Sequence, residues 1–181
     1  MVTGKTDGRG MSRALRLRPP GPGDEEEFRA ACRAMVPDGF TFGLDLEPGM
    51  AWDTYLKTLG DQRAGVNLPA DRVPAAFLVA DVAGEIAGRA SIRYTLNDFL
   101  ARQGGHIGYC VLPAHRRRGY ATEILRQSLV IARANGVGRA LVICDEDNAG
   151  SRGVIEACGG QLESIAEIAP AAPRIRRYWI D

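Results

Sequence analysis

The chain has 181 residues, of which 45% are hydrophobic and 25% charged, as is typical of one folded domain of ordinary size. Its 23 basic and 22 acidic side chains leave a net charge of +1, so the basic excess typical of nucleic-acid-binding proteins is missing. No apolar run approaches the roughly 20 residues of a membrane-spanning helix. We therefore expect neither a nucleic-acid nor a membrane partner.

The N-terminus predicts a flexible tail over residues 1–12, followed by one domain over residues 13–181. The first ten residues lack the apolar centre of a secretory signal, which favours a cytoplasmic protein. The cysteines show no CxxC spacing and the chain contains no HExxH, so no metal site is expected. The four cysteines are Cys32, Cys110, Cys144 and Cys158.

The first third of the chain predicts one strand and two helices. Residues 15–18 alternate leucine with arginine and stop at Pro19, which indicates a strand. Asp24 with Glu27 three residues later predicts a capping box at the start of the first helix. That helix should bury Phe28, Cys32 and Met35. A second helix is predicted over residues 48–59, with Trp52, Leu56 and Leu59 on one face, followed by a loop over residues 60–74.

A β-hairpin is predicted next, because two β-rich runs over residues 75–81 and 86–94 flank Ala83-Gly84. Residues 106–112 then indicate a further strand. A helix is expected over residues 119–135, with Gly136 ending it.

The last part of the chain predicts a buried strand, a short helix and a closing strand pair. Residues 137–144 are apolar apart from Arg139, as in a strand covered on both faces. Asn148 indicates the N-cap of a helix to about residue 158. Residues 161–168 and 174–180 should pair antiparallel. The complete order, β-α-α-β-β-β-α-β-α-β-β, predicts an α/β fold with a mixed sheet.

One stretch indicates chemistry: the strand over residues 106–112 leads into Arg116-Arg117-Arg118, then Gly119 and a helix. The first amides of a helix lack intrahelical partners and carry partial positive charge, which suits a phosphate or pyrophosphate. Glycine allows close approach of the backbone. The alternative is a solvated basic loop, since neither GxxxxGK[ST] nor GxGxxG is present.

Val111-x-Pro113 followed by Arg116-x-x-Gly119-x-Ala121 resembles the acyl-CoA signature of the GNAT superfamily of N-acetyltransferases. The residues over 92–98 and 104–109 resemble one bacterial subgroup of predicted acetyltransferases. The resemblance implies a single-domain GNAT-like fold with a mostly antiparallel sheet, a splayed strand pair and flanking helices. It also implies acetyl-CoA as co-substrate and a small-molecule or peptide amine as acceptor. Homodimers are common in the superfamily, so a homodimer is one expectation.

The resemblance also implies site residues. The backbone of Tyr109, Cys110 and Val111 would bind the pantetheine arm along the strand edge. Asn148 would contact the pantetheine region, although a helix cap explains it equally well. The amides of the loop and helix start would hold the pyrophosphate; these residues are Arg116, Arg117, Arg118, Gly119, Tyr120, Ala121 and Thr122.

The sequence departs from the family at its two commonest catalytic positions. Many members have a tyrosine seven residues after the asparagine, where this chain has Ile155, and a glutamate in the strand, where residues 106–112 have none. Tyr109, His106 and the acidic residues 145–147 are the available substitutes, and each has an ordinary structural explanation. We take Tyr109 as the catalytic candidate. A non-catalytic acyl-CoA-binding sensor or regulatory module is the alternative.

Two further expectations concern the surroundings of this stretch. Cys110 should be structural, because a nucleophilic cysteine needs a positioned base and His115, beyond Pro113, is expected to face solvent. The acidic residues 145–147 favour a cationic acceptor, such as a polyamine.

Overall fold

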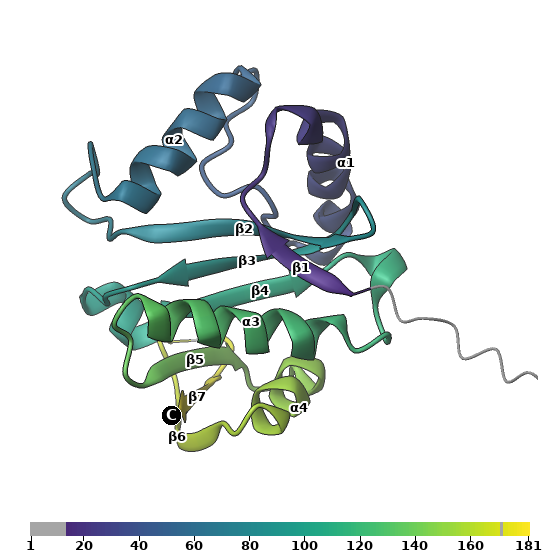
Figure 1. The fold of residues 1–181 in the computed structure, drawn as a ribbon. Helices are drawn as coiled ribbons and strands as arrows, with labels where there is room; N and C mark the ends of the chain where they lie inside the picture. Colours follow the sequence, from purple (N-terminus) through teal and green to yellow (C-terminus); the bar gives the residue numbers. More distant parts are fainter. Residues whose placement is uncertain (1–13, 171) are drawn as a thin grey trace, which may run out of the picture.

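Two antiparallel sheets form the computed structural model, which describes residues 14–170 and 172–181 (Figure 1). One sheet has the strand order β1-β2-β3-β4 and the other has β5-β7-β6. The strands are β1 (Leu15–Arg18), β2 (Ala75–Val82), β3 (Glu85–Arg93), β4 (Ile107–Val111), β5 (Ala140–Asp145), β6 (Gln161–Ala166) and β7 (Ile175–Ile180). The helices are α1 (Glu25–Met35), α2 (Trp52–Ala64), α3 (Tyr120–Ala134) and α4 (Ala149–Ala157). The α/β class is confirmed, and the tail predicted for residues 1–12 lies outside the described residues.

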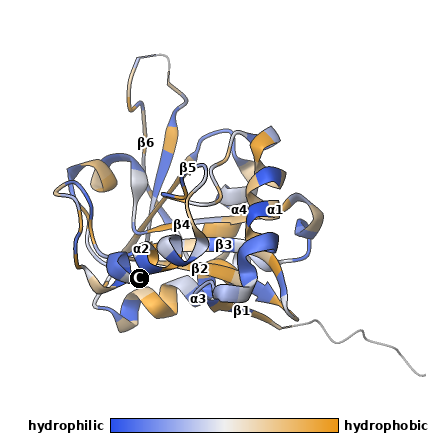
Figure 2. Ribbon diagram, turned by 90° about the horizontal axis from the view of Figure 1, so that it is seen from above, coloured by the Kyte–Doolittle hydropathy of each residue, from blue (hydrophilic) through white to orange (hydrophobic). Residues whose placement is uncertain are grey.

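Helices cover both faces of the first sheet: α1 and α2 lie on one side and α3 on the other (Figure 1). Strands at the centre of the molecule are accordingly coloured mostly as hydrophobic in Figure 2, whereas the helices carry both hydrophobic and hydrophilic residues. On β2, Leu78 and Ala80 pack in the α3-side core, while Phe77 and Val79 pack in the α1/α2-side core. This double cover explains the nearly unbroken burial of β2, because successive side chains of a strand point to opposite faces.

The predicted hairpin is confirmed. β2 and β3 pair antiparallel, and the two connecting residues both have left-handed backbone angles, with φ of 56° at Ala83 and 91° at Gly84. Such a two-residue loop matches the right-handed twist of the strands that it joins.

β4 and β5 diverge from a contact at His106, which produces the splayed pair expected from the resemblance. The His106 amide donates to the Leu141 carbonyl at 2.7 Å, and the Leu141 amide donates to His106 Nδ1 at 2.9 Å. Gly105 precedes this contact with φ of 66°, and a Cβ there would lie 2.6 Å from the Leu141 carbonyl oxygen. Beyond the contact, β4 and β5 are edge strands of different sheets.

The second helix begins and ends later than predicted: α2 spans Trp52–Ala64 instead of residues 48–59. Gly49 adopts a positive φ of 78° before the helix and so keeps residues 48–51 out of it. Gly60 does not end the helix, because it lies at an exposed position where it is tolerated at a cost of about 1 kcal/mol. The helix instead ends at Gly65, whose φ is 71°.

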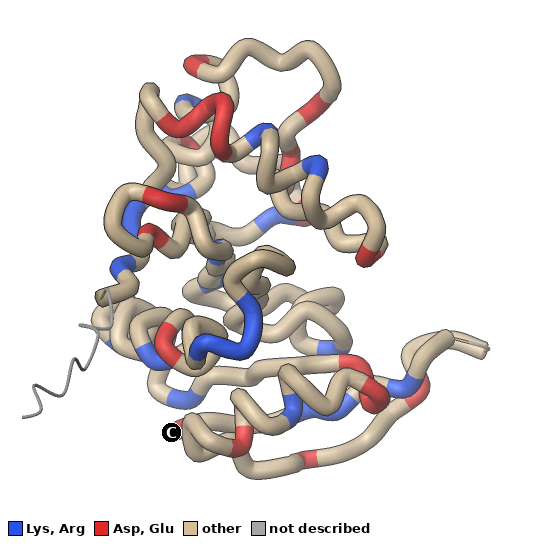
Figure 3. The backbone as a smooth tube through the Cα atoms, turned by 90° about the vertical axis from the view of Figure 1, so that its right-hand side faces the viewer, with Lys and Arg blue, Asp and Glu red and all other residues tan. Residues whose placement is uncertain are grey.

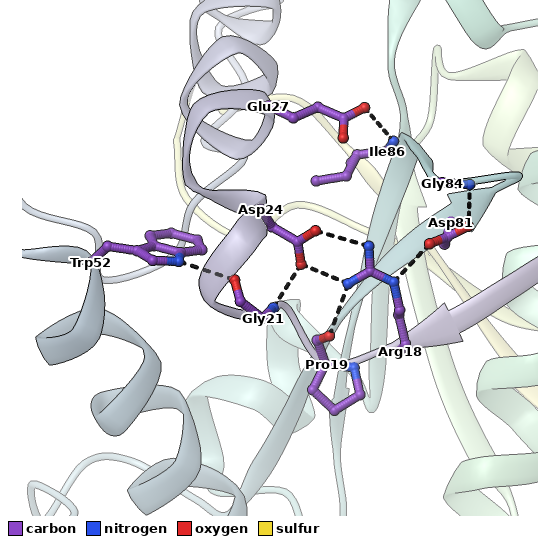
Figure 4. A network of polar contacts seen from close by, with 9 residues as sticks. All are labelled: Arg18, Pro19, Gly21, Asp24, Glu27, Trp52, Asp81, Gly84 and Ile86. Atoms are coloured by element: carbon purple, nitrogen blue, oxygen red, sulfur yellow. Dashed lines mark hydrogen bonds and ion pairs between the residues drawn. The ribbon is translucent and has the colours of Figure 1, made fainter.

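The predicted capping box is wrong, because Asp24 and Glu27 bind other groups (Figure 4). Asp24 forms a two-pronged ion pair with Arg18 of β1, at 2.6 and 2.9 Å, and accepts from the Gly21 amide. The Glu27 carboxylate accepts from the Ile86 amide at 2.6 Å, which ties α1 to β3. Arg18 also binds Asp81 of β2 at 2.7 Å, so the arginine links the helix entry to two strands.

We expect Asp24→Asn to lower the free energy of unfolding by about 1–3 kcal/mol at pH 7, because it removes a charge-assisted pair that is mostly shielded from solvent. The hydrogen bond from Arg18 holds the pKa of the Asp24 carboxyl below its usual range. The stabilisation is therefore present above about pH 4 and is lost as the pH falls through the lowered pKa. Urea unfolding at pH 7 and pH 3 measures the difference.

The control for this prediction is Asp61→Asn, which removes the carboxylate paired with Lys57 within α2. The Asp61 side chain is more exposed than that of Asp24. That change should alter stability far less than Asp24→Asn does, because water screens the exposed pair. Equal losses in the two variants, or a loss at Asp24 that does not shrink towards pH 3, would contradict the assignment.

Candidate functional site

A cavity of about 750 Å³ opens where β4 and β5 separate. Its walls come from β4, the loop before α3, the first turn of α3 and the first turn of α4. All the residues predicted to bind the cofactor line this cavity except Arg118. They are Tyr109, Cys110, Val111, Arg116, Arg117, Gly119, Tyr120, Ala121, Thr122 and Asn148.

The backbone of β4 presents hydrogen-bonding groups to the cavity, and among them the Val111 carbonyl already accepts from Arg116 Nε. The Arg93 amide donates to the His106 carbonyl, and the Leu112 amide donates to the Ala87 carbonyl. Along an antiparallel strand, every second residue hydrogen-bonds to a given neighbour. These two bonds therefore show that the even-numbered residues of β4 pair with β3. Tyr109 and Val111 therefore turn their N–H and C=O groups away from β3, towards the gap. An extended amide-containing ligand could pair with this edge as an added strand.

The start of α3 provides the second set of free donors. Gly119 has φ of 81° and is the N-cap, and the first helical bond runs from the Glu123 amide to the Gly119 carbonyl. The amides of Tyr120, Ala121 and Thr122 consequently have no acceptor within the helix. A Cβ on Gly119 would meet no atom within 4 Å, so the glycine is required here by its backbone angle. This donor set fits a pyrophosphate.

The three consecutive arginines, a continuous blue stretch of the tube in Figure 3, take different positions. Arg116 is paired with Asp38 and donates from Nε to the Val111 carbonyl at 3.2 Å, so it joins β4 to the end of α1. Its own amide donates to Pro113 and is not free for a ligand. Arg117 lines the cavity with a left-handed φ of 62°, whereas Arg118 lies outside the lining.

The cavity also has a wall that the sequence did not reveal. Met35, Asp38 and Phe40, from the end of α1 and the following segment, lie against it. They come from about 70 residues before β4, and the pairing of Asp38 with Arg116 holds them there. No local motif around residues 35–40 signals this role.

Tyr109 extends from β4 to α4, and its hydroxyl lies 3.5 Å from the Ser151 carbonyl oxygen in the first turn of that helix. Burial raises the pKa of Tyr109 to about 12, so the phenol remains a proton donor across the physiological range. Ile155, at the position where many family members have tyrosine, is fully buried in the α3-side core. The structure thus places a phenol beside α4, but the phenol comes from β4 and not from the helix itself.

The other two catalytic candidates differ in their surroundings. His106 is 8% exposed, lies outside the cavity lining and uses Nδ1 to accept from Leu141. Burial and the nearby Arg93 lower its pKa, which favours the neutral ring that this bond requires. Among the acidic residues, Glu146 lies 3.4 Å from Arg174 and 3.6 Å from Arg176. Asp145 is the member of this run that lines the cavity.

Cys110 is buried, and burial raises the pKa of its thiol to about 11, so the reactive thiolate is disfavoured. The expectation that His115 faces solvent is wrong: it lines the cavity beside Tyr120, with ring centroids 6.4 Å apart. The short helical turn Pro113–His115 is responsible, because it carries the side chain back over the loop. Its Nδ1 atom is buried without a hydrogen-bond partner among the described residues.

Among residues 14–170 and 172–181, no group of three or more His, Cys, Asp and Glu side chains is placed to hold a metal ion. No helix in this part of the chain combines the length and apolar character needed to cross a membrane.

The model of the acetyltransferase (GNAT) domain family matches residues 14–161. This match covers every wall of the cavity. Among curated proteins, none is similar in sequence.

Several solved structures share the fold. The yncA structure from Salmonella typhimurium, with its cofactor acetyl-CoA, is 16% identical, with a TM-score of 0.60 over 93% of this chain and 94% of that one. The microcin C7 self-immunity acetyltransferase MccE, in complex with acetyl-CoA and AMP, is 19% identical, with a TM-score of 0.63 over 91% of each chain. RimJ from Mycobacterium smegmatis, in complex with CoA-disulfide, is 19% identical, with a TM-score of 0.64 over 92% of this chain and 81% of that one.

Proposed function

Because the chain belongs to the GNAT acetyltransferase family, we propose that it transfers the acetyl group of acetyl-CoA to a primary amine. The observation that carries the proposal is one cavity that combines the free backbone edge of β4 with the free amides at the start of α3. These two donor sets suit the two chemically different parts of one elongated ligand. The acetyl-CoA present in the yncA and MccE structures supports the identity of that ligand.

The residues that would hold acetyl-CoA follow from these donors. The outward-facing N–H and C=O of Tyr109 would bind the pantetheine amides, and Asn148 lines the same cavity. The amides of residues 120–122 would bind the pyrophosphate, assisted by Arg117. When bound, acetyl-CoA supplies an activated thioester whose carbonyl carbon accepts the amine. The outward N–H of Val111 is our candidate for stabilising the developing oxyanion.

Two side chains of the cavity are assigned the proton transfers. The acceptor amine must lose a proton, since an ordinary lysine-like amine has a pKa of about 10.4. Asp145 lines the cavity, and no ion pair engages it among the described residues, so we assign it proton acceptance, directly or through water. Tyr109 carries a proton that it can give to the departing sulfur. The amine nitrogen thereby gains the acetyl group, and the carbon–sulfur bond breaks to give a thiol.

A non-catalytic acyl-CoA-binding sensor is the second candidate. Two observations favour it: Ile155 is a core residue, and β4 carries no glutamate. In such a module the same cavity would bind acetyl-CoA, and the ligand would alter a partner instead of reacting.

Calorimetric titration with acetyl-CoA, with free CoA and ATP as controls, tests the proposal. We expect micromolar binding of acetyl-CoA and weaker or no binding of ATP. Release of free thiol that depends on an added amine then supports the enzyme. Binding without amine-dependent release over a broad amine panel supports the sensor, and failure to bind acetyl-CoA overturns both.

A further inference from the structure

Two arginines of β3 converge on one point of β4 beside the cavity. Arg89 and Arg93 lie on the α1/α2 side of the sheet, the face opposite Ala90 and Ile92, which pack in the α3-side core. Their Nη1 atoms lie 3.9 and 3.4 Å from the position that a Cβ would take on Gly108. Because Gly108 has no side chain, both guanidinium groups can lie close to this one point of the β4 backbone.

Neither guanidinium forms an ion pair among residues 14–170 and 172–181. Arg89 is 4% exposed, donates from Nη2 to the Thr41 carbonyl at 3.0 Å, and leaves Nε buried without a described partner. Asp45, from the loop before α2, pairs with Arg72 instead. Burial lowers the pKa of Arg93 to about 10 and that of Arg89 as well, and the nearby charges of Arg89 and Arg72 lower that of Arg93 further. A buried positive charge at Arg89 beside a half-buried one at Arg93, without an anion, is costly to retain.

A purely structural role explains only part of this arrangement. The Arg89 guanidinium lies 4.8 Å from the centroid of the Phe40 ring and 5.7 Å from that of Phe77, and such cation–π contacts stabilise a buried cation. They do not neutralise it, however, and within the described part of the chain Arg93 makes no such contact. The uncompensated charge of the pair is what an anionic ligand would satisfy.

The pair also lies next to the reaction site. Cys110 lines the cavity, is the strand partner of Arg89 and lies two residues after Gly108 on the same face of β4. Two strand residues span roughly 7 Å. Phe40 lines the same cavity and its ring also contacts the Arg89 guanidinium, so this side chain connects the cavity with the arginine pair.

We propose that Arg89 and Arg93 bind an anionic group, a carboxylate or phosphate, of the acceptor amine. This inference rests on the proposed function and narrows its acceptor to amines that carry an anion about 5–7 Å from the nitrogen, the span from Cys110 to Gly108. It opposes the cationic acceptor suggested by the acidic residues 145–147. Bidentate guanidinium contacts with oxyanions are the chemistry that would recognise the group.

Matched amine pairs test the proposal. The probes are the unbranched amino acids from glycine to 5-aminopentanoate, each compared with its neutral amide, and 4-aminobutylphosphonate as the phosphate-like arm. Amine-dependent thiol release gives kcat/KM. For at least one of the longer acids or the phosphonate, we expect kcat/KM to be about 10- to 100-fold higher than for its uncharged counterpart. This ratio is what one charge-assisted hydrogen bond predicts. The acid and phosphonate arms then separate the two anion types.

Variants identify the residues that are responsible. Arg93→Met should lower kcat/KM for the preferred anionic amine about 10- to 100-fold, leave the amide unchanged and leave the affinity for acetyl-CoA unchanged; Arg93→Lys should recover part of the loss. Arg89→Met should act likewise, and thermal unfolding should show it folded, because an apolar side chain can replace a buried unpaired charge. Arg63→Met, which changes an exposed arginine of α2, is the charge-matched control.

Binding of the same probes to the CoA-saturated protein, measured by calorimetry, provides a readout that does not depend on turnover. Stronger binding of acids than of amides, lost in Arg93→Met, supports the anion site even if no thiol is released, an outcome that would count against the proposed function alone. The anion site is overturned if amides bind or react as well as acids, or if Arg93→Met weakens both members of each pair equally.

Discussion

Replacing Tyr109 with phenylalanine should lower kcat about 100-fold and leave the affinity for acetyl-CoA unchanged, because a positioned general acid contributes about 100- to 10,000-fold and only the phenolic proton is removed. Phenylalanine keeps the packing of the ring between β4 and α4. Steady-state thiol release together with calorimetry measures both quantities.

The pH dependence sharpens this prediction. Burial raises the pKa of Tyr109 to about 12, so the hydroxyl remains protonated while the amine, with a pKa of about 10.4, becomes neutral. The wild-type rate should therefore rise with pH as the amine loses its proton, with no fall assignable to Tyr109 below about pH 11. The neutral phenol also stabilises the fold below pH 10, and this contribution is lost as the pH rises towards 12.

Tyr178→Phe is the matched control, because Tyr178 is buried and its hydroxyl donates to Glu156 at 3.0 Å, away from the cavity. It should cost about 1 kcal/mol of stability and leave kcat unchanged. A Tyr109→Phe enzyme with wild-type kcat would remove Tyr109 from the mechanism and leave it as a packing residue.

Gly119→Val should weaken acetyl-CoA binding at least about 10-fold, which corresponds to roughly 1.4 kcal/mol. The φ of 81° at Gly119 is unfavourable by roughly 1–2 kcal/mol for any residue with a Cβ, and a β-branched side chain adds to that. The backbone should then rotate and turn the first amides of α3 away from the pyrophosphate. Calorimetric titration of the variant with acetyl-CoA measures the loss.

Gly136→Val controls for the backbone strain, because Gly136 follows the other end of α3 with φ of 90° and a Cβ there also meets no atom within 4 Å. Both variants should lose similar stability, but only Gly119→Val should lose affinity. Unchanged affinity in Gly119→Val would show that the pyrophosphate lies elsewhere.

The part of the cavity proposed to bind acetyl-CoA could be located from the sequence because its residues are contiguous. Strand, turn glycine and helix start all fall within residues 109–122, and each part has a local requirement: alternation, a positive φ or free first-turn amides. The same holds for the hairpin at Ala83-Gly84 and for the Asn148 cap, which accepts from Ser151. Local chemistry decides such features, so the sequence displays them.

The proposed anion site at Arg89 and Arg93 could not be predicted, because its surroundings are assembled from distant segments. The run Arg89-Ala90-Ser91-Ile92-Arg93 resembles a strand with one polar, solvated face, yet the segment around Phe40 covers that face. Asp24 and Glu27 had the spacing of a capping box, but Arg18 and Ile86 compete for the two carboxylates more effectively. In each case a contact distant in sequence outweighs the local preference.

The contact of His106 with Leu141 has a consequence for the lifetime of the protein. Each sheet is built from its own stretch of chain, and the cavity is lined by β4 of one sheet and by Asp145 of β5 in the other. A ligand bound there would contact both, in addition to the core that the two sheets share. By mass action, acetyl-CoA at 100 times its Kd would add about 2.7 kcal/mol to the free energy of unfolding. If acetyl-CoA binds as proposed, the resistance of the protein to proteolysis should rise with the concentration of acetyl-CoA.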